Sequence, residues 1–400
     1  MGPRKIFALP FDENACLLLA RIRTCCLDSR RPPKLTPQKI MINPDPQFWA
    51  NRKVLITGHT GFKGSWLSMW LGSLGARVTG YSLEPPSKPA MFELLSLDDQ
   101  MDSVIGDIRD LDRLADTVHT SEPSVIFHLA AQSLVRPSYE DPLGTYTTNV
   151  IGTANLLEVA RSARDLDAVV VVTSDKCYAD RGDKRHHVEQ DPMGGHDPYS
   201  SSKGCAELVT SAFRSSYFEK AGASSRPVPI ATTRAGNVIG GGDWATDRLI
   251  PDIVRSFGAH EPVRIRNPHA VRPWQHVLEP LGGYLVLAER LCTDGMAYAD
   301  AWNFGPLESD ARPVGWIVEQ LATVWGSGFE WTIDDGDHPH ESGFLMLDIA
   351  KAQAELHYSP RLDLAKALVW VAEWYDAYLR RRDLLEITNS QIARFEELLR

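Results

Sequence analysis

The chain contains 400 residues, of which 43% are hydrophobic and 24% are charged, and its formal net charge at pH 7 is −10. This length and balance predict a soluble globular protein with one large domain or two closely associated ones. The acidic charge, without a basic stripe among aromatic residues, argues against nucleic-acid binding, and no apolar run reaches the roughly 18 residues of a membrane span. The cysteines show no metal-ligand spacing, which favours a reducing cytoplasm; they are Cys16, Cys25, Cys26, Cys177, Cys205 and Cys292.

Residues 1–40 differ in composition from the rest of the chain, because basic residues outnumber acidic ones there. The apolar run at residues 15–20 is short and no small-residue cleavage site follows it, which argues against a secretory signal. An organellar transit peptide is the alternative. We expect residues 1–45 to be a disordered or mis-assigned leader, with Met41 as the natural start.

The first predicted strand leads directly into a glycine-rich turn and a helix. Residues 53–57 have the pattern of a buried strand, and the glycines that follow have the spacing G-x-x-G-x-x-G. Glycines let a backbone approach a pyrophosphate closely, and the start of a helix offers it free amide groups. The turn is therefore predicted to bind a dinucleotide through Gly58, Thr60, Gly61, Phe62, Lys63 and Gly64. A tight turn without a ligand is the alternative.

Strands and helices alternate along the next part of the chain. Strands are predicted at 77–81, 103–106, 124–129, 168–173 and 230–234, and helices at 111–118 and 145–161. This alternation predicts an α/β fold with a Rossmann-like, doubly wound parallel sheet. Ligands of such sheets bind beyond the carboxyl ends of the strands, so residues that follow strands should meet at one edge. These residues are Gly58, Asp107, Ala130, Ser174 and Ala235.

A further helix begins at Pro198, and Asp197 is placed to cap it. Tyr199 and Lys203 are four residues apart, so their side chains lie on one face of this helix. An ammonium group beside a phenol favours the phenolate and lowers its pKa from about 10 towards neutrality. The pair is therefore predicted to accept a proton from an alcohol. An ordinary amphipathic helix with a chance Tyr-x-x-x-Lys is the alternative.

The alternation stops after residue 234, where glycines, prolines, arginines and tryptophans accumulate. Helices are predicted at 282–291, 314–324 and 362–379. We expect residues 46–235 to form the dinucleotide-binding domain, with residues 273–300 rejoining it. Residues 236–272 and 301–390 are expected to form a smaller, interwoven substrate-binding lobe.

Five long motifs occur in a fixed order through most of the chain. They are residues 58–67, 173–178, 192–195, 234–244 and 272–280. With them, about residues 50 to 385 resemble the extended short-chain dehydrogenase/reductase family, and within it the nucleotide-sugar 4,6-dehydratases that act on CDP-glucose. The resemblance implies a dimer or tetramer, with helices of the sheet domain paired, and a place in deoxysugar and surface-polysaccharide synthesis.

The resemblance also implies an internal redox elimination that needs five catalytic residues. Tyr199 takes the 4-hydroxyl proton while hydride passes from sugar C4 to NAD, Lys203 lowers the tyrosine pKa and holds the cofactor, and Ser174 binds the 4-oxygen. Asp175 is the acid for the water that leaves C6, and hydride returns to C6 to give CDP-4-keto-6-deoxy-D-glucose. Related dTDP-glucose dehydratases have glutamate where this chain has Lys176, so the identity of the C5 base stays open between Lys176 and a structural role for that lysine.

The remaining cofactor contacts are expected at Asp107, Ile108, Leu129, Ala130 and Ala131. Asp107 can accept from the adenine amine or cap a turn. The acidic residue expected about 20 residues past the glycine turn is absent, with Ser82 and Glu84 nearby. No arginine is placed there for a 2′-phosphate, so NAD is favoured over NADP, mainly through the resemblance.

For the nucleotide sugar, Arg248 and Arg272 are expected at the diphosphate, because guanidinium groups match phosphate oxygens. Trp244 or Trp274 stacks near the cytosine or packs in the core, Asn237 contacts a phosphate or caps a turn, and Gln132 and Ser133 face the sugar. No metal site is expected, since the histidines at 186–187 and 338–340 lie in polar loops without a third ligand. An epimerase, a dehydratase for a dTDP-, GDP- or UDP-sugar, and a non-catalytic NAD-binding protein are the alternatives.

Overall fold

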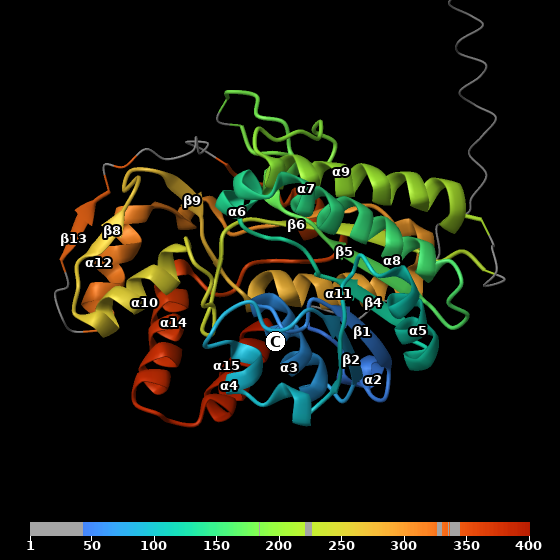
Figure 1. The fold of residues 1–400 in the computed structure, drawn as a ribbon, viewed down its shortest axis with the longest axis horizontal. Helices are drawn as coiled ribbons and strands as arrows, with labels where there is room; N and C mark the ends of the chain where they lie inside the picture. Colours follow the sequence, from blue (N-terminus) through green and yellow to red (C-terminus); the bar gives the residue numbers. More distant parts are fainter. Residues whose placement is uncertain (1–42, 184, 221–225, 326–329, 335, 337–344) are drawn as a thin grey trace, which may run out of the picture. The chain divides into compact units, whose positions relative to one another are not determined.

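A seven-stranded parallel sheet is the centre of the computed structural model, which describes residues 43–183, 185–220, 226–325, 330–334, 336 and 345–400 (Figure 1). The strand order is β11-β6-β5-β4-β1-β2-β3. The strands are β1 (Lys53–Thr57), β2 (Arg77–Ser82), β3 (Asp102–Ile105), β4 (Val125–His128), β5 (Ala168–Val172), β6 (Ile230–Ala235) and β11 (Ala301–Phe304). The chain leaves β1 in one direction for β2 and β3 and then returns to β4 on its other side. This reversal is where doubly wound sheets bind ligands, so the predicted fold class is confirmed.

Helices cover both faces of the sheet (Figure 1). One face carries α5 (Leu111–Ser121), α8 (Gly152–Ala160) and α9 (Pro198–Phe213), and the other carries α3 (Phe62–Ser73), α11 (Leu278–Asp294) and α15 (Leu384–Leu399). No helix in the described ranges is long and apolar enough to cross a membrane. The shorter or peripheral helices are α2 (Pro46–Trp49), α4 (Met91–Leu94), α6 (Val135–Glu140), α7 (Pro142–Tyr146), α10 (Leu249–Ala259), α12 (Val314–Val324), α13 (Ala350–Glu355) and α14 (Leu364–Leu379).

Alternate residues of the strands build two separate cores. In β1, Leu55 packs with Leu156 and Leu157 of α8, whereas Val54 and Ile56 belong to the core that includes α3 and α11. Because successive side chains of a strand point to opposite faces, a central strand needs apolar residues at every position. This explains why the central strands β1, β4 and β5 appear in the sequence as short apolar runs, whereas the edge strand β3 does not.

Helix α3 is buried along nearly its whole length, which its sequence did not indicate. An apolar face was predicted for it, but Trp66 and Met69 are buried as well as Leu67 and Trp70. Two different segments cover it: Trp66 Nε1 donates to the Gly241 carbonyl oxygen at 2.9 Å, and Trp70 Nε1 donates at 2.8 Å to Glu396 of α15, a helix that was not predicted. The last helix of the chain therefore covers the helix that follows the glycine turn.

The helix predicted at 145–161 is instead three consecutive segments. Helix α7 ends at Tyr146, a π-helical turn spans Thr147–Ile151, and α8 starts at Gly152. Within the turn, the Asn149 side chain donates to the Gln132 carbonyl oxygen at 2.9 Å and accepts from the Gln132 N–H at 2.8 Å. The wider turn thus fixes the loop that follows β4, at the edge where ligands bind.

The smaller lobe is built from α10, α12, α14 and short strand pairs at one end of the molecule (Figure 1). The short strands are β7 (Val238–Ile239), β8 (Val263–Ile265), β9 (Val271–Pro273), β10 (Gln275–His276), β12 (Ala311–Pro313) and β13 (Trp331–Ile333). Helix α10 was not predicted. Strand β11 pairs with β6, so the sheet extends past the predicted boundary at residue 300.

The predicted leader lies outside the described residues except for residues 43–45. These three belong to the folded chain: Asp45 caps α2, and its N–H donates to Glu289 at 2.7 Å. The folded part therefore begins before the predicted boundary at residue 45.

Candidate active site

A cleft of about 1520 Å³ opens beyond the carboxyl ends of the sheet strands and is closed on its far side by the lobe. Every residue predicted for the site lines it. From the sheet domain these are Gly58, Thr60, Gly61, Phe62, Lys63, Gly64, Asp107, Ile108, Leu129, Ala130, Ala131, Gln132, Ser133, Ser174, Asp175, Lys176, Tyr199 and Lys203. From the following segment they are Asn237, Trp244, Arg248, Arg272 and Trp274.

The glycine turn has the shape that a dinucleotide needs. Gly58 has a φ of +80°, and a Cβ there would lie 2.7 Å from the Ala130 nitrogen. A Cβ on Gly64 would lie 2.1 Å from the Gly58 carbonyl oxygen, so only glycine lets the turn close onto α3. Gly61 precedes α3 without a side-chain cap, which leaves the first amides of the helix available to a pyrophosphate. The residues present therefore fit a dinucleotide.

Asp107 is already engaged by its own turn. Its carboxylate accepts from the backbone N–H of Arg109 at 2.9 Å and forms an ion pair with the Arg109 side chain. These hydrogen bonds hold the pKa of Asp107 below its usual value. The turn-capping alternative is thus realised, although the carboxylate still lines the cleft. After β2, Thr60 and Ser82 share a hydrogen bond of 2.9 Å.

The start of α9 places Tyr199 in the cleft wall. Asp197 accepts from the Ser200 N–H at 2.9 Å, as predicted for a cap, and Ser138 of α6 accepts from the Tyr199 N–H at 3.1 Å. Tyr199 is 8% exposed and Lys203 is 6% exposed. The helix is therefore fixed at both its first turn and its cleft-facing side.

The prediction of a lowered tyrosine pKa is wrong for the protein without ligands. Burial raises the pKa of Tyr199 to about 12, and the Ser174 hydroxyl opposes this only in part. Burial also lowers the pKa of Lys203 to about 8, against the opposing effect of Glu207. Lys203 Nζ donates to the Val172 carbonyl oxygen at 3.3 Å. The loss of solvation outweighs the charge one helical turn away, which sequence spacing could not reveal.

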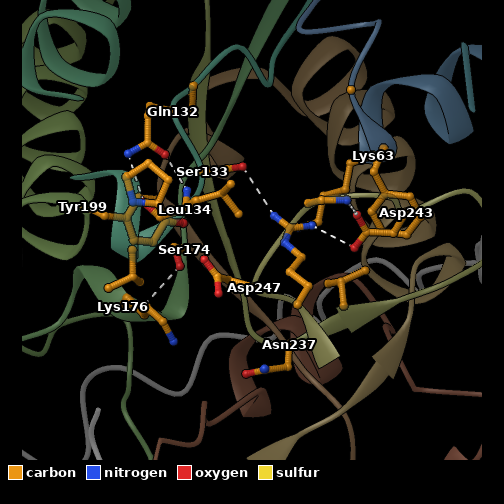
Figure 2. Close-up of a pocket in the computed structure, with 18 of the residues that line it drawn as sticks. Lys63, Gln132, Ser133, Leu134, Ser174, Lys176, Tyr199, Asn237, Asp243 and Asp247 are labelled. Carbon is orange, nitrogen blue, oxygen red and sulfur yellow. Dashed lines mark hydrogen bonds and ion pairs between the residues drawn. The ribbon is translucent and has the colours of Figure 1, made fainter. Parts of the chain in front are cut away.

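The turn after β5 carries the other predicted catalytic groups (Figure 2). Ser174 donates to Asp175 Oδ1 at 3.1 Å and accepts from the Lys176 N–H at 3.2 Å. Asp175 is 3% exposed, and its Oδ2 has no hydrogen-bond partner among the described residues. A Cβ on Gly236 would lie 2.9 Å from that oxygen. The glycine after β6 therefore leaves the space that the carboxylate occupies.

On the substrate side, Arg248 bonds to side chains from two different segments of the chain. It donates to Asp243 Oδ2 at 3.0 Å and to Ser133 Oγ at 3.3 Å. Asp243 was not predicted, and it neutralises part of the charge expected to meet a diphosphate. The Gln132 side chain was expected to face the sugar, but it accepts from the Leu134 N–H at 2.5 Å and donates to the Leu134 carbonyl at 2.9 Å. Gln132 therefore shapes the loop.

The remaining predicted residues lie at the cleft wall in packed positions. Trp244 is 8% exposed with its ring 5.3 Å from Tyr375, and Trp274 is 5% exposed with Nε1 bound to the Arg312 carbonyl at 3.2 Å. The core alternative applies to both, although both still border the cleft. Arg272 is 7% exposed and donates to the Val271 carbonyl at 3.1 Å.

Several residues that line the cleft were not predicted. Arg136 pairs with Asp247 at 3.1 Å, and Arg181 pairs with Asp191. His187, which was expected in a polar loop, is instead buried: it is 8% exposed, and its ring stacks on Tyr178 with the centroids 4.6 Å apart. The other unpredicted lining residues include Arg185, Arg264, Arg266 and Asn267. Arginines in loops of this kind carry no periodic signal, so only a concentration of arginines in the sequence could have indicated them.

Metal-binding geometry does not occur in the described part of the chain, where no group of three or more His, Cys, Asp or Glu side chains could hold an ion. The histidines at 338 and 340 lie outside the described residues.

The sequence matches the GDP-mannose 4,6 dehydratase family over residues 55–369. It is 51% identical over 349 residues to CDP-glucose 4,6-dehydratase of Salmonella typhimurium, which covers 87% of this chain and 97% of that protein. It is 28% identical over 344 residues to dTDP-glucose 4,6-dehydratase of Xanthomonas campestris pv. campestris, with 80% and 92% covered.

Solved structures share the fold. DesIV, a dTDP-glucose 4,6-dehydratase from Streptomyces venezuelae with NAD and TYD bound, has a TM-score of 0.69 and 24% identity, covering 83% of this chain and 99% of that chain. MoeE5 in complex with UDP-glucose and NAD has a TM-score of 0.68 and 25% identity, covering 82% and 99%. Structural relatives thus bind NAD. Together with the family match, the chain belongs to the extended short-chain dehydrogenase/reductase family of NAD-dependent nucleotide-sugar epimerases and dehydratases.

Proposed function

We propose that this enzyme converts CDP-D-glucose to CDP-4-keto-6-deoxy-D-glucose and water, with NAD as its cofactor. The observation that carries the proposal is the buried Asp175 carboxylate with a free oxygen, beside Ser174 and Tyr199 in one cleft. An acid beside a redox pair suits loss of water from the sugar. The 51% identity to a CDP-glucose 4,6-dehydratase supports the choice of nucleotide.

NAD would be held by the glycine turn and the start of α3, and when bound it supplies the acceptor and later the donor of hydride. Tyr199 would take the proton of the 4-hydroxyl. Because burial raises its pKa to about 12 without ligands, only a small fraction is phenolate at neutral pH, although the Ser174 hydroxyl and the positive charge of Arg248 oppose this rise. Lys203 is the ammonium proposed to favour the phenolate once ligands are bound. The rate of sugar oxidation is therefore expected to rise with pH until Lys203 loses its proton.

Asp175 would hold the proton that leaves with the C6 oxygen as water. Asp175 lines the same cleft as Tyr199, its Oδ2 has no hydrogen-bond partner among the described residues, and Gly236 keeps the space beside that oxygen free of side-chain atoms. Lys176, on the same turn, is the candidate for removing the C5 proton. Its side chain lines the cleft, and its backbone N–H fixes it to Ser174.

Incubation of the purified protein with CDP-glucose tests the proposal. A 4-keto-6-deoxy sugar gives an enone absorbance after alkali, and we expect this signal with CDP-glucose. Signal only with dTDP-, GDP- or UDP-glucose would assign a different nucleotide. Interconversion of C4 epimers without enone formation would make the protein an epimerase, and NAD binding without any turnover would make it a non-catalytic protein.

Self-association is a further part of the proposal, in which the enzyme forms a homodimer or homotetramer through α7, α8 and α9. The apolar side chains of Leu143 in α7, Ile151 in the π-helical turn before α8 and Leu208 in α9 are 76%, 51% and 60% exposed. A charged residue in such a patch should break the interface. Leu208→Glu should lower the mass in light scattering to that of a monomer, and an unchanged mass would contradict this assembly.

A further inference from the structure

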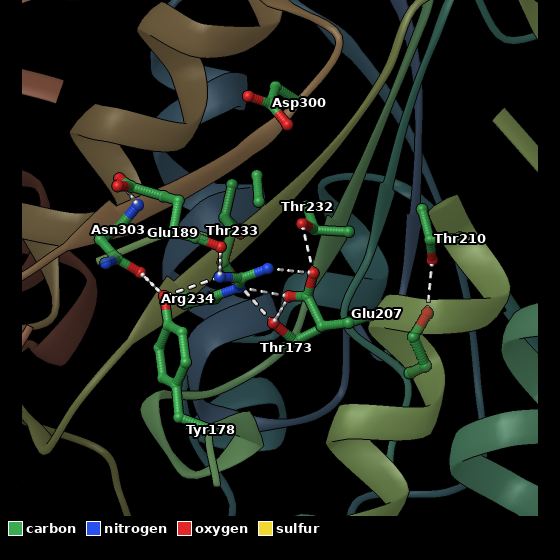
Figure 3. Close-up of polar contacts among 12 residues, drawn as sticks. Thr173, Tyr178, Glu189, Glu207, Thr210, Thr232, Thr233, Arg234, Asp300 and Asn303 are labelled. Carbon is green, nitrogen blue, oxygen red and sulfur yellow. Dashed lines mark hydrogen bonds and ion pairs between the residues drawn. The ribbon is translucent and has the colours of Figure 1, made fainter. Parts of the chain in front are cut away.

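Figure 3 shows an ion pair between Glu207 and Arg234, which bind Thr173 and Tyr178 on either side of the turn that carries Ser174 and Asp175, here called the catalytic turn. Glu207 of α9 and Arg234 of β6 are each 4% exposed at the side chain and form two hydrogen bonds of 2.8 and 2.9 Å. Burial disfavours the charged form of both groups, but each stabilises the charge of the other, so that the pKa of Glu207 is lowered and that of Arg234 is raised. Neither residue lines the cleft, so neither can contact a substrate or cofactor there.

The pair contacts both ends of the segment that carries Ser174 and Asp175. Thr173, immediately before it, donates from Oγ1 to Glu207 at 2.5 Å. Tyr178, just after it, accepts from Arg234 Nη1 at 2.6 Å. The turn between these two residues is therefore tied at both ends to a single buried unit.

The same unit reaches the helix that carries the tyrosine. Glu207 lies one helical turn after Lys203 on α9, and its charge opposes the lowering of the Lys203 pKa by burial. Helix α9 also packs tightly on the turn, since a Cβ on Gly204 would lie 3.1 Å from the Cys177 carbonyl oxygen. A shift of the pair would thus change the distance between the acid on the turn and the phenol on the helix.

We propose that Glu207 and Arg234 are positioning residues that set the placement of Ser174 and Asp175 relative to Tyr199 and Lys203. This inference rests on the proposed function for the identity of the reacting groups. The competing view is a buried ion pair that contributes to stability alone. If the pair positions the turn, removing a hydrogen bond that joins the pair to the turn should impair catalysis more than removing one that joins it to another segment. If the pair contributes to stability alone, the two removals should have the same effect.

Two threonines provide a matched comparison. Thr173 and Thr232 both donate to the Glu207 carboxylate, at 2.5 and 2.7 Å, but only Thr173 adjoins the catalytic turn. Valine has the same shape as threonine without the hydroxyl, so Thr173→Val and Thr232→Val each remove one donor from the same carboxylate. Tyr178→Phe removes the hydroxyl at the other end of the turn and keeps the ring.

We expect Thr173→Val and Tyr178→Phe to lower kcat by about tenfold or more, with KM for the nucleotide sugar and NAD affinity within about twofold. Thr232→Val should keep kcat within about twofold, although it should lose about as much thermal stability as Thr173→Val does. If kcat falls equally in both threonine variants, or in none of the three, the positioning role is overturned.

Hydrogen–deuterium exchange of residues 174–178 separates this inference from the substrate assignment. Thr173→Val should speed exchange in this segment, and Thr232→Val should not, whatever sugar the enzyme uses. Equal exchange in both variants would overturn the positioning role. If the wild-type protein turns over no CDP-glucose, the proposed function is overturned, but the comparison of exchange rates between the two threonine variants still tests the positioning role.

Discussion

At the scale of single residues, the position of the Asp175 carboxylate depends on the absence of a side chain at Gly236. An added Cβ at Gly236 would meet Asp175 Oδ2 at 2.9 Å and Pro273 Cγ at 3.0 Å, and a buried aspartate has little room to move away. We expect Gly236→Ala to lower kcat by about tenfold or more, because small misplacements of a reacting group are costly. Enone formation at saturating substrate measures this. Gly305→Ala, where the nearest atom would be 3.5 Å away, should retain activity; normal turnover by Gly236→Ala would contradict the argument.

Lys176 is the residue on which the sequence left a choice, and substitution can decide it. Methionine keeps the length of the side chain and removes the amine, so Lys176→Met should bind NAD normally and lose elimination by about 100-fold or more. Release of the C5 proton into solvent and enone formation are the measurements. Lys366→Met changes an exposed lysine of α14 and should be neutral. Normal turnover by Lys176→Met would show that this lysine is structural.

At the scale of elements, α3 contains two glycines with different surroundings. A Cβ on Gly64 would lie 2.1 Å from the Gly58 carbonyl oxygen, whereas one on Gly72 would meet nothing within 4 Å. Gly64→Ala should therefore open the glycine turn and weaken NAD binding by at least tenfold. Gly72→Ala should leave NAD binding unchanged and stabilise the protein by about 0.5–1 kcal/mol through helix propensity. Calorimetric NAD titration and thermal denaturation test both, and equal NAD affinity in the two variants would refute this account.

At the scale of the whole molecule, five buried groups link stability to pH. Burial lowers the pKa of His59 to about 4 and those of His128 and His276 to about 3, from 6.5. The stability they contribute is present above pH 6.5 and is lost as the pH falls towards these lower values, because the unfolded chain then binds more protons. Burial raises the pKa of Glu279 to about 7 and that of Glu289 to about 8, from 4.5. Their contribution is present below pH 4.5 and is lost as the pH rises through 7 and 8.

We therefore expect Tm to be highest near pH 6.5, where the histidines of the unfolded chain are losing their protons while Glu279 and Glu289 still hold theirs in the folded state. Thermal denaturation across about pH 5 to 9 measures this. Glu289→Gln keeps an acceptor for Trp49 Nε1, which donates to Glu289 at 2.6 Å, and removes one titrating group. Its alkaline decline should be shallower than that of the wild type, and an unchanged slope would exclude Glu289 as a source of the decline.

Local patterns in the sequence were sufficient to predict the sheet strands from β1 to β6 and the glycine turn. A strand buried on both faces, such as β5, is an apolar run, and a turn at a φ of +80° needs glycine, so both leave a signature within a few residues. The pairing of Tyr199 with Lys203 on one helix follows from helical spacing in the same way. These features depend only on neighbours along the chain.

Tertiary packing decided the rest. Helix α15 packs on α3, and strand β11 pairs with β6 at the edge of the sheet, so both depend on segments far away in the sequence. The pKa of Tyr199 likewise depends on burial by elements distant along the chain. The pairing of Glu207 with Arg234 joins a helix to a strand across 27 residues. The sequence alone therefore determined the kinds of groups in the cleft. Their protonation and spacing were set by the loss of water around them, which is a property of the folded chain.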